Sequence, residues 1–193
     1  MEYQRVNILD LLDEIGEGAL NEFLSYFSCP NQDVSDFLHK NAIEFAKQGK
    51  SVSYLVFSNE FDLLGYYTIA IKPISVARKS ISKSMANRIS RVSHDNADST
   101  TFTLSAYLIA QLGKNFNIQK ENRIKGRVLL GLAEDTVAQL RHNAGGVIQF
   151  LECEDSPFLL NFYQQYGYTL FDQRDVFSSE GEKRLLHQLF RKI

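Results

Sequence analysis

Apolar residues recur at intervals of three and four near the N-terminus, the spacing of an amphipathic helix. The next part of the chain is rich in β-branched and aromatic residues, which favour strands, with a short polar turn that predicts a β-hairpin. The first half is therefore expected to hold two helices and two strands: residues 8–27, Asp33–Gln48, Ser51–Phe57 and Leu63–Ile71. Gly16 and Gly18 predict either a bend in the first helix or its division into two.

In the second half of the chain, segments with helical periodicity alternate with segments typical of strands. Residues 76–93 carry apolar side chains at helical spacing and predict a short amphipathic helix, which a polar loop over His94–Thr100 follows. Strands are expected at Phe102–Leu112, Val147–Cys153, Tyr168–Phe171 and Arg184–Phe190. Two further helices are expected at Lys125–His142 and Pro157–Tyr166, the first after a polar connection over residues 113–123.

This order of elements predicts an α/β (α+β) fold. Strand–helix–strand connections in the second half indicate right-handed crossovers on a partly parallel sheet, and the early hairpin indicates an antiparallel part of the same sheet. We expect a mixed sheet of about seven strands flanked by helices. No linker or repeat divides the sequence, which predicts a single domain over residues 1–193.

Composition narrows the class of protein. The chain has 193 residues, 44% hydrophobic and 23% charged, which is typical of a soluble globular protein. No apolar run is long enough for a membrane helix and no signal peptide is visible, so we expect a cytoplasmic protein that does not bind a membrane. A net charge of −2 removes the usual electrostatic argument for nucleic acid. Two isolated cysteines and four dispersed histidines predict buried thiols and no metal site.

One candidate anion site lies where the polar connection after the long strand enters the next helix. Arg123, Lys125 and Arg127 surround a helix start at Gly126. The first amides of a helix lack intrahelical partners and the helix dipole favours negative charge, so this arrangement would suit a pyrophosphate. The alternative is that Gly126 eases a turn and the cations are only solvated.

A second candidate lies where the strand ending at Cys153 runs into the last helix. Ligands of open α/β sheets bind at strand ends of this kind. The segment Glu152–Pro157 is acidic and is followed by three aromatic residues at helical spacing, Phe162, Tyr163 and Tyr166. Taken alone, such an aromatic stripe is more often part of a core than of a site.

These segments resemble the GNAT N-acetyltransferases, which use acetyl-CoA. Phe158–Tyr168 (FLLNFYQQYGY) resembles the closing motif of that family, and Ile109–Asn115 resembles its central strand. Phe27–Leu38 together with Gly65-Tyr66-Tyr67-Thr68 resembles a branch that includes toxins acetylating aminoacyl-tRNA. The element order matches the family over most of the chain.

The phosphate loop of the family, R/Q-x-x-G-x-G/A, matches only in part. With Gly126 as the last small residue, Glu121 takes the place of the arginine or glutamine and Ile124 that of the first glycine. With Arg123 as the arginine, the loop reads Arg123-x-x-Gly126-x-Val128. Both alignments leave a side chain where main chain should touch the pyrophosphate, which predicts weaker cofactor binding or an altered loop.

The resemblance implies an acetyl-CoA-dependent N-acetyltransferase without a metal. Tyr163 takes the position of the general acid that protonates the departing thiolate, and Glu152 or Glu154 are candidates for the base. The residues implied to bind acetyl-CoA lie at the strand end, in the loop and before the last helix: Leu112, Gly113, Lys114, Arg123, Ile124, Lys125, Gly126, Arg127 and Ser156.

The acceptor is expected to be an amine on a small molecule or a protein. Two alternatives stay open: a non-catalytic module that binds CoA or a partner protein, and a toxin that acetylates aminoacyl-tRNA. A homodimer is also left open. Residues 76–92 carry five cations and no acid, Arg78, Lys79, Lys83, Arg88 and Arg91. We expect this segment on the acceptor side, where it would attract carboxylates or phosphates, with a merely solvated surface as the alternative.

Overall fold

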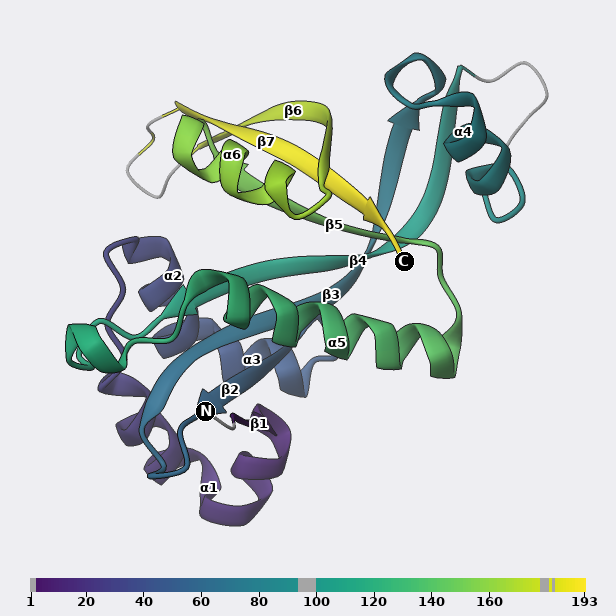
Figure 1. The fold of residues 1–193 in the computed structure, drawn as a ribbon. Helices are drawn as coiled ribbons and strands as arrows, with labels where there is room; N and C mark the ends of the chain where they lie inside the picture. Colours follow the sequence, from purple (N-terminus) through teal and green to yellow (C-terminus); the bar gives the residue numbers. More distant parts are fainter. Residues whose placement is uncertain (1–2, 94–99, 178–180, 182) are drawn as a thin grey trace. The chain divides into compact units, whose positions relative to one another are not determined.

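A computed structural model describes residues 3–93, 100–177, 181 and 183–193. The chain forms two compact units, each built from two separate stretches of sequence (Figure 1). Unit 1 is Met1–Ala70 with Ile109–Thr136, and unit 2 is Ile71–Leu108 with Val137–Ile193. The predicted loop His94–Thr100 lies outside the described residues except for Thr100.

The described residues form a seven-stranded sheet in the order β1-β2-β3-β4-β5-β7-β6. The strands are β1 Gln4–Asn7, β2 Val52–Phe57, β3 Leu63–Ala77, β4 Thr101–Lys114, β5 Ile148–Glu154, β6 Thr169–Phe177 and β7 Lys183–Lys192. The printed pairings of β1 with β2, β2 with β3, β5 with β7 and β6 with β7 are antiparallel. The predicted α/β fold with about seven strands is confirmed.

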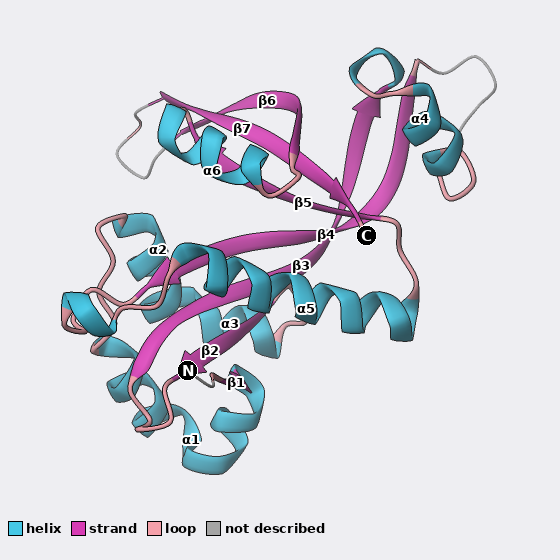
Figure 2. Ribbon diagram, in the orientation of Figure 1, coloured by secondary structure: helices cyan, strands magenta, loops and turns pink. Residues whose placement is uncertain are grey.

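Helices flank these strands, as Figure 2 shows by colour. They are α1 Ile8–Ser25, α2 Gln32–Asp36, α3 Ala42–Lys47, α4 Lys83–Ile89, α5 Gly126–Ala144 and α6 Pro157–Gln165. Three short helical turns join them: a π turn at Phe37–Asn41 and 3-10 turns at Arg78–Ser80 and Lys120–Asn122. Gly16 has a φ of 75° inside α1, so the predicted bend is confirmed at the residue that tolerates a left-handed conformation.

The two faces of β3 bury different partners in unit 1. Tyr66 packs in a core with Leu55 and the apolar faces of α1 and α3, and its hydroxyl donates to the Val34 carbonyl at 2.6 Å. The neighbouring Tyr67 faces the other way, where its hydroxyl lies 2.6 Å from Thr136 of α5. Strand alternation thus places the first helices on one face and α5 on the other.

Unit 2 is organised around the β5-β7-β6 strands. Cys153 pairs with His187 and Glu152 with Gln188, so successive residues of β5 face opposite sides. Ile148 and Phe150 of β5 pack with Phe171 of β6, the outer parts of β3 and β4, and α4. Gln149 faces the other side and donates to the hydroxyl of Tyr168, which follows α6.

One strand was missed and two predicted boundaries were wrong. The strand β1 was not predicted, because four residues carry too little periodicity to stand out. Residues 76 and 77 belong to β3 and the helix covers only Lys83–Ile89, since Ile74 and Val76 alternate inward as strand residues past Pro73. Residues 113 and 114 continue β4 instead of opening the polar connection.

Candidate functional site

The end of β4 is held tightly in unit 1 by a glycine. A Cβ atom at Gly113 would lie 2.6 Å from Val34 Cγ1 and 3.0 Å from Phe27 Cζ, so a side chain there would force these two packed side chains to shift. Leu112 and Lys114 flank this position and are half-buried. Packing alone thus requires the glycine that the resemblance assigns to cofactor binding.

The connection from β4 to α5 is fixed by a network around Asn115. Its side-chain amide donates to the Leu63 carbonyl at 2.9 Å, and its side-chain oxygen accepts from the amides of Ser28 and Asn117. The Phe116 amide donates to the Ser28 carbonyl at 2.7 Å. Asn115 is buried, so these bonds are shielded from water and hold the loop against the start of β3.

The Arg123 side chain forms hydrogen bonds to main-chain carbonyls of the same loop. Its Nε donates to the Ile118 carbonyl at 2.9 Å and its Nη2 to the Phe116 carbonyl at 2.8 Å. The guanidinium also lies over the Phe116 ring, 4.5 Å from its centroid. Two of its three nitrogens are therefore engaged within the loop, which gives Arg123 a bracing role that the sequence did not predict.

The next four residues differ in what they present to solvent. Ile124 is only 2% exposed, so it anchors the loop in the interior of unit 1 and offers little surface to a ligand. Lys125 and Arg127 are exposed, with Arg127 also 2.9 Å from Glu134. The Lys125 carbonyl accepts the first bonds of α5, from Val128 and Leu129. The helix therefore begins at Gly126, as predicted, with Lys125 and Arg127 exposed on either side of it.

Tyr163 lies on α6 in unit 2 and is 8% exposed. Its ring packs edge-on against Phe162 and Tyr168, and no described residue forms a hydrogen bond with its hydroxyl. Burial, and to a smaller extent the Cys153 thiol, raises the pKa of Tyr163 above its ordinary value. The phenol therefore stays protonated at neutral pH.

The turn before α6 is tied to β7 by a buried histidine. His187 is 5% exposed; its Nε2 lies 2.8 Å from Asp155 Oδ1 and its Nδ1 lies 3.1 Å from Gln173 Nε2. Ser156 caps α6 by position but makes no side-chain capping bond. Burial, followed by the charges of Glu154 and Asp155, raises the pKa of Cys153 to about 11, so this thiol is unreactive at neutral pH.

Glu152 points to the opposite face of β5, into a polar cluster. Arg174 binds both of its oxygens, at 2.7 and 2.6 Å, and Gln188 donates to one of them at 2.6 Å. Burial alone would raise the pKa of Glu152, but these hydrogen bonds outweigh it and hold the pKa below its ordinary value. A carboxylate with a lowered pKa and three donors is a weak base, which leaves Glu154 as the better of the two predicted candidates.

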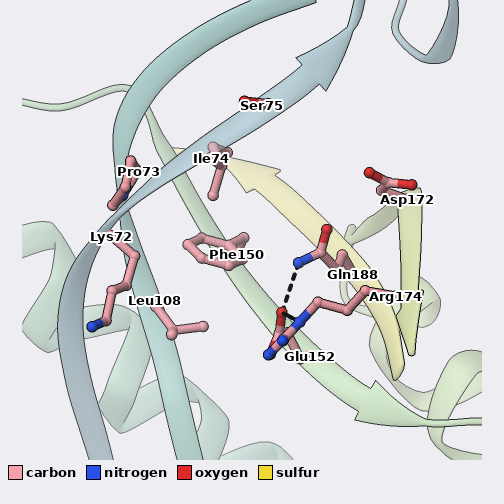
Figure 3. A pocket seen from close by; sticks show the side chains of 10 residues that line it. All are labelled: Lys72, Pro73, Ile74, Ser75, Leu108, Phe150, Glu152, Asp172, Arg174 and Gln188. Carbon is pink, nitrogen blue, oxygen red and sulfur yellow. Dashed lines mark hydrogen bonds and ion pairs between the residues drawn. The ribbon is translucent and has the colours of Figure 1, made fainter. Parts of the chain in front are cut away.

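This cluster lines a pocket of about 440 Å³ that lies wholly in unit 2 (Figure 3). We call it the unit 2 pocket; its lining residues are Lys72, Pro73, Ile74, Ser75, Leu108, Phe150, Glu152, Asp172, Arg174 and Gln188. Phe150, Ile74 and Leu108 form its apolar wall, and the charged residues lie at its sides. The sequence did not predict it, because its residues come from five strands.

Two of the five cations of residues 76–92 contact other described residues of unit 2. The Arg78 guanidinium lies 4.1 Å from the centroid of the Phe102 ring, and Arg88 donates to the Ile193 main-chain oxygen at 3.2 Å. Lys83 and Arg91 are exposed. Ile81 and Met85 pack on the unit 2 core, as the predicted amphipathic pattern requires. Within the described residues no group of metal-ligating side chains is present, and no helix has the length and apolarity to cross a membrane.

No protein-family model matches the chain, and no curated protein sequence matches it. Solved structures do. AtaT complexed with acetyl-methionyl-tRNAfMet is 17% identical, with a TM-score of 0.66 over 99% of this chain and 95% of that one. A tyrosine-to-phenylalanine mutant of KacT is 16% identical, with a TM-score of 0.65 over 100% and 95%. AtaTR bound with AcCoA is 16% identical, with a TM-score of 0.59 over 99% and 93%. The chain therefore has the fold of AtaT and KacT, as the GNAT resemblance predicted.

Proposed function

We propose that this protein is an acetyl-CoA-dependent N-acetyltransferase. The observation that carries the proposal is its fold, which matches a structure bound with AcCoA over nearly the whole length of both chains. The helix start at Gly126 with its exposed cations and the buried Tyr163 on α6 support it, because an anion can bind at the first feature and the second can donate a proton.

The residues around the start of α5 suit the phosphates of acetyl-CoA. Gly126 carries no side chain and Ile124 is turned inside, so the approach to the first amides is not blocked by either. Lys125 and Arg127 supply positive charge at the surface. We assign phosphate binding to residues 125–127, with Leu112, Gly113 and Lys114 along the pantetheine arm and Ser156 before α6.

In the proposed reaction the acceptor amine attacks the thioester carbonyl directly. The new C–N bond forms, the C–S bond breaks, and the leaving thiolate takes the Tyr163 hydroxyl proton. A base removes one proton from the amine nitrogen; Glu154 can serve through a water molecule, whereas Glu152 is committed to Arg174. Orientation of the two substrates supplies much of the rate.

The proposal is tested by following release of the CoA thiol from acetyl-CoA with mixtures of amines. We expect release that depends on the amine and equals the acetylated product in amount. Binding of acetyl-CoA without release across the amine set would favour the non-catalytic module instead. Absence of binding would overturn the enzyme and the CoA-binding module, since both require the cofactor, and would leave a module that binds a partner protein.

A second candidate acceptor is aminoacyl-tRNA. It is favoured by the neighbour AtaT, which is complexed with acetyl-methionyl-tRNAfMet, and by the cations at Lys83 and Arg91 in a chain of net charge −2. Phosphates would be drawn to such a segment more strongly at low ionic strength.

Acetylation of charged tRNA by the purified protein tests this candidate. We expect the Lys83→Ser, Arg91→Ser double variant to lose kcat/KM at low salt, with a smaller loss at high salt. Lys40→Ser is the matched control, because Lys40 is an exposed cation paired with Asp36 in unit 1. A double variant equal to wild type at every salt concentration would show that Lys83 and Arg91 are solvated surface side chains with no role in binding the acceptor.

A further inference from the structure

We propose that unit 1 carries a docking groove for a cationic segment of another protein, anchored by one large apolar side chain. We call it the α1 groove. Its volume is about 330 Å³, and its lining residues are Gln4, Val6, Leu11, Glu14, Ile15, Phe23, Phe57 and Phe61. All of them belong to unit 1, and none has a role in the proposed transfer of an acetyl group.

A bend in α1 and the first pair of strands form the groove. Gly16, with a φ of 75°, interrupts α1, so Ile15 lines the groove from before the bend and Phe23 from after it. The other side is formed by β1, where Gln4 is paired with Phe57 of β2. Figure 1 shows α1 beside these two strands. Elements on both sides therefore fix the width of the groove.

The groove has a buried aromatic floor and an apolar rim that is open to water. Phe57 is 7% exposed, and its ring stacks on that of Phe23 with 5.8 Å between the centroids. Ile15 and Phe61 are 46% and 71% exposed. Large apolar side chains that stay exposed together on one groove mark an interaction site. A volume of about 330 Å³ is at the lower end for ligand sites and suits one or two inserted side chains.

Phe61 is held at the rim by the turn between β2 and β3. The Ser58 hydroxyl oxygen accepts from the amides of Glu60 and Asp62, each at 3.1 Å, and the Ser58 carbonyl accepts from the Phe61 amide at 3.1 Å. The φ of Phe61 is 63°, a conformation that a glycine would adopt at lower cost. The turn itself therefore does not require a phenylalanine, whose ring adds apolar surface to the groove.

The carboxylates around the groove decide the charge of the partner. Glu14 lines the groove, and Glu60 and Asp62 stand on either side of Phe61 in the turn; all three acids are exposed. Neither α1 nor residues 58–62 contain a lysine or an arginine, although the whole chain has 21 of them. The local charge is therefore negative.

The cations of β1 and α3, Arg5 and Lys47, are engaged in other contacts. Lys47 binds Glu17 at 2.6 Å, and Arg5 donates to Leu132 and Thr136 of α5, on the face of β1 opposite to Gln4. The groove thus attracts a segment with Lys or Arg around its apolar anchor, and it repels nucleic acids and acidic peptides. A neutral apolar ligand would leave the carboxylates unused.

The test measures binding of a synthetic peptide, acetyl-Arg-Arg-Trp-Leu-Arg-Arg-amide, to the full chain by calorimetric titration without acetyl-CoA. Because its N-terminus is blocked and it has no lysine, the peptide offers no acceptor amine to the proposed enzyme. We expect binding to weaken about tenfold or more when Trp and Leu are replaced by Ala, since the apolar anchor is lost. The analogue with Glu in place of each Arg is expected not to bind.

Phe61→Gly tests the rim of the groove. We expect it to weaken peptide binding about tenfold or more, because apolar contact surface is removed. Its Tm should equal or exceed that of wild type, because glycine relieves the positive φ and the Phe61 ring is largely exposed. Phe177→Gly is the matched control, since Phe177 is 73% exposed in unit 2, and it should bind the peptide like wild type.

The Glu14→Gln, Glu60→Gln double variant tests the charge of the groove. We expect binding to weaken about threefold or more at low salt and by less at high salt, because exposed charge pairs are modest in strength and screened by ions. Glu44→Gln is the control, because Glu44 is an exposed carboxylate of α3 that does not line the groove, and it should bind like wild type.

Failure of the peptide to bind, or equal binding by Phe61→Gly and wild type, would overturn the proposal. Binding of the Glu analogue as tight as that of the probe would overturn the cationic partner. A dimer in analytical ultracentrifugation that Phe61→Gly dissociates would make a second copy the occupant and also overturn the proposal. Release of the CoA thiol should be the same in Phe61→Gly and wild type, so the groove and the proposed enzyme fail independently.

Discussion

At the scale of single residues, Glu152 shows how hydrogen bonding can decide the state of a carboxyl group. Three donors surround it, and its pKa is held below the ordinary value although it is largely buried. The group is therefore ionised throughout the neutral range. Its contribution is to the stability of the β5-β7-β6 strands more than to proton transfer.

The sign of this shift fixes a pH dependence. Since the folded pKa lies below the unfolded one, the stabilising contribution is complete above the ordinary glutamate pKa of about 4.3 and is lost as the pH falls through the folded pKa. We expect Glu152→Gln to lower the free energy of unfolding at pH 7 and to approach wild type on acidification. Urea unfolding at several pH values measures this, with Glu60→Gln, an exposed carboxylate in the β2–β3 turn, as the control.

Tyr163→Phe should lower turnover while leaving the fold intact. The substitution removes one hydroxyl and keeps the ring that packs against Phe162 and Tyr168. Loss of general-acid assistance is typically about 100- to 10,000-fold in rate. Steady-state kinetics check the rate and calorimetric titration checks acetyl-CoA affinity. Tyr166→Phe, directly after the same helix, is the control, and equal turnover of all three proteins would exclude Tyr163 from the mechanism.

Ile124→Gly would restore the glycine of the GNAT phosphate loop, yet we expect it to be harmful. The isoleucine is buried, and removing a large buried aliphatic side chain costs about 2–5 kcal/mol in the free energy of unfolding. Urea denaturation measures the loss, with the half-exposed Val92→Gly for comparison. A variant as stable as wild type would show that the loop does not depend on this anchor.

At the scale of elements, the β4–α5 loop is held by contacts within itself, to the start of β3 and to the residues that follow α1. Asn115 and Arg123 supply most of the side-chain bonds, and both work on main-chain carbonyls or amides. We therefore infer that Arg123 positions the loop, while the exposed Lys125 meets the phosphates. The two roles differ in their response to salt.

Lys125→Gln should weaken acetyl-CoA binding most at low ionic strength, since an exposed cation–phosphate contact is screened by salt over about 10 Å at 0.1 M. Arg123→Gln should weaken binding by the same factor at low and high salt, because it acts through the shape of the loop. Calorimetric titration over a series of salt concentrations distinguishes them. The reverse pattern would make Arg123 the phosphate contact and Lys125 a bystander.

At the scale of the whole molecule, the proposed cofactor should raise thermal stability. A ligand at a hundredfold excess over Kd stabilises by about 2.7 kcal/mol. For a chain of this size each kcal/mol raises Tm by roughly 2–4 °C, so a shift of about 5–11 °C is expected. Differential scanning calorimetry with acetyl-CoA, and with adenosine as a control that lacks phosphates, measures it. An unchanged Tm at millimolar acetyl-CoA would contradict cofactor binding.

The sequence predicted elements wherever a long periodic pattern existed. Periodic apolar positions predicted α1 and α5, and a continuous run of strand-forming residues over Phe102–Leu112 predicted β4. The bend at Gly16 was predicted because glycine readily adopts a positive φ. The short strand β1 and the extension of β3 past Pro73 were missed because tertiary pairing outweighs weak local preference there.

The site was less predictable than the fold. Candidate residues on one continuous segment, such as Lys125 and Gly126, lie together as expected. Side chains that meet across strands were not predicted: Glu152 with Arg174, and His187 with Asp155, are 22 and 32 residues apart in the chain. The contacts of Arg123 within the loop could not be predicted either, because it donates to main-chain carbonyl groups, which every residue carries.

The burial of Ile124 bears on how such loops diverge between related chains. A glycine in a sequence motif records that no side chain may occupy the outer surface of a turn. An apolar residue that is turned into a waiting interior satisfies the same requirement, at 2% exposure here, by a different route. The requirement is that the outer surface of the turn carries no side chain, and more than one residue type can meet it. A sequence pattern that lists only glycines at such positions therefore misses loops that use a buried apolar residue.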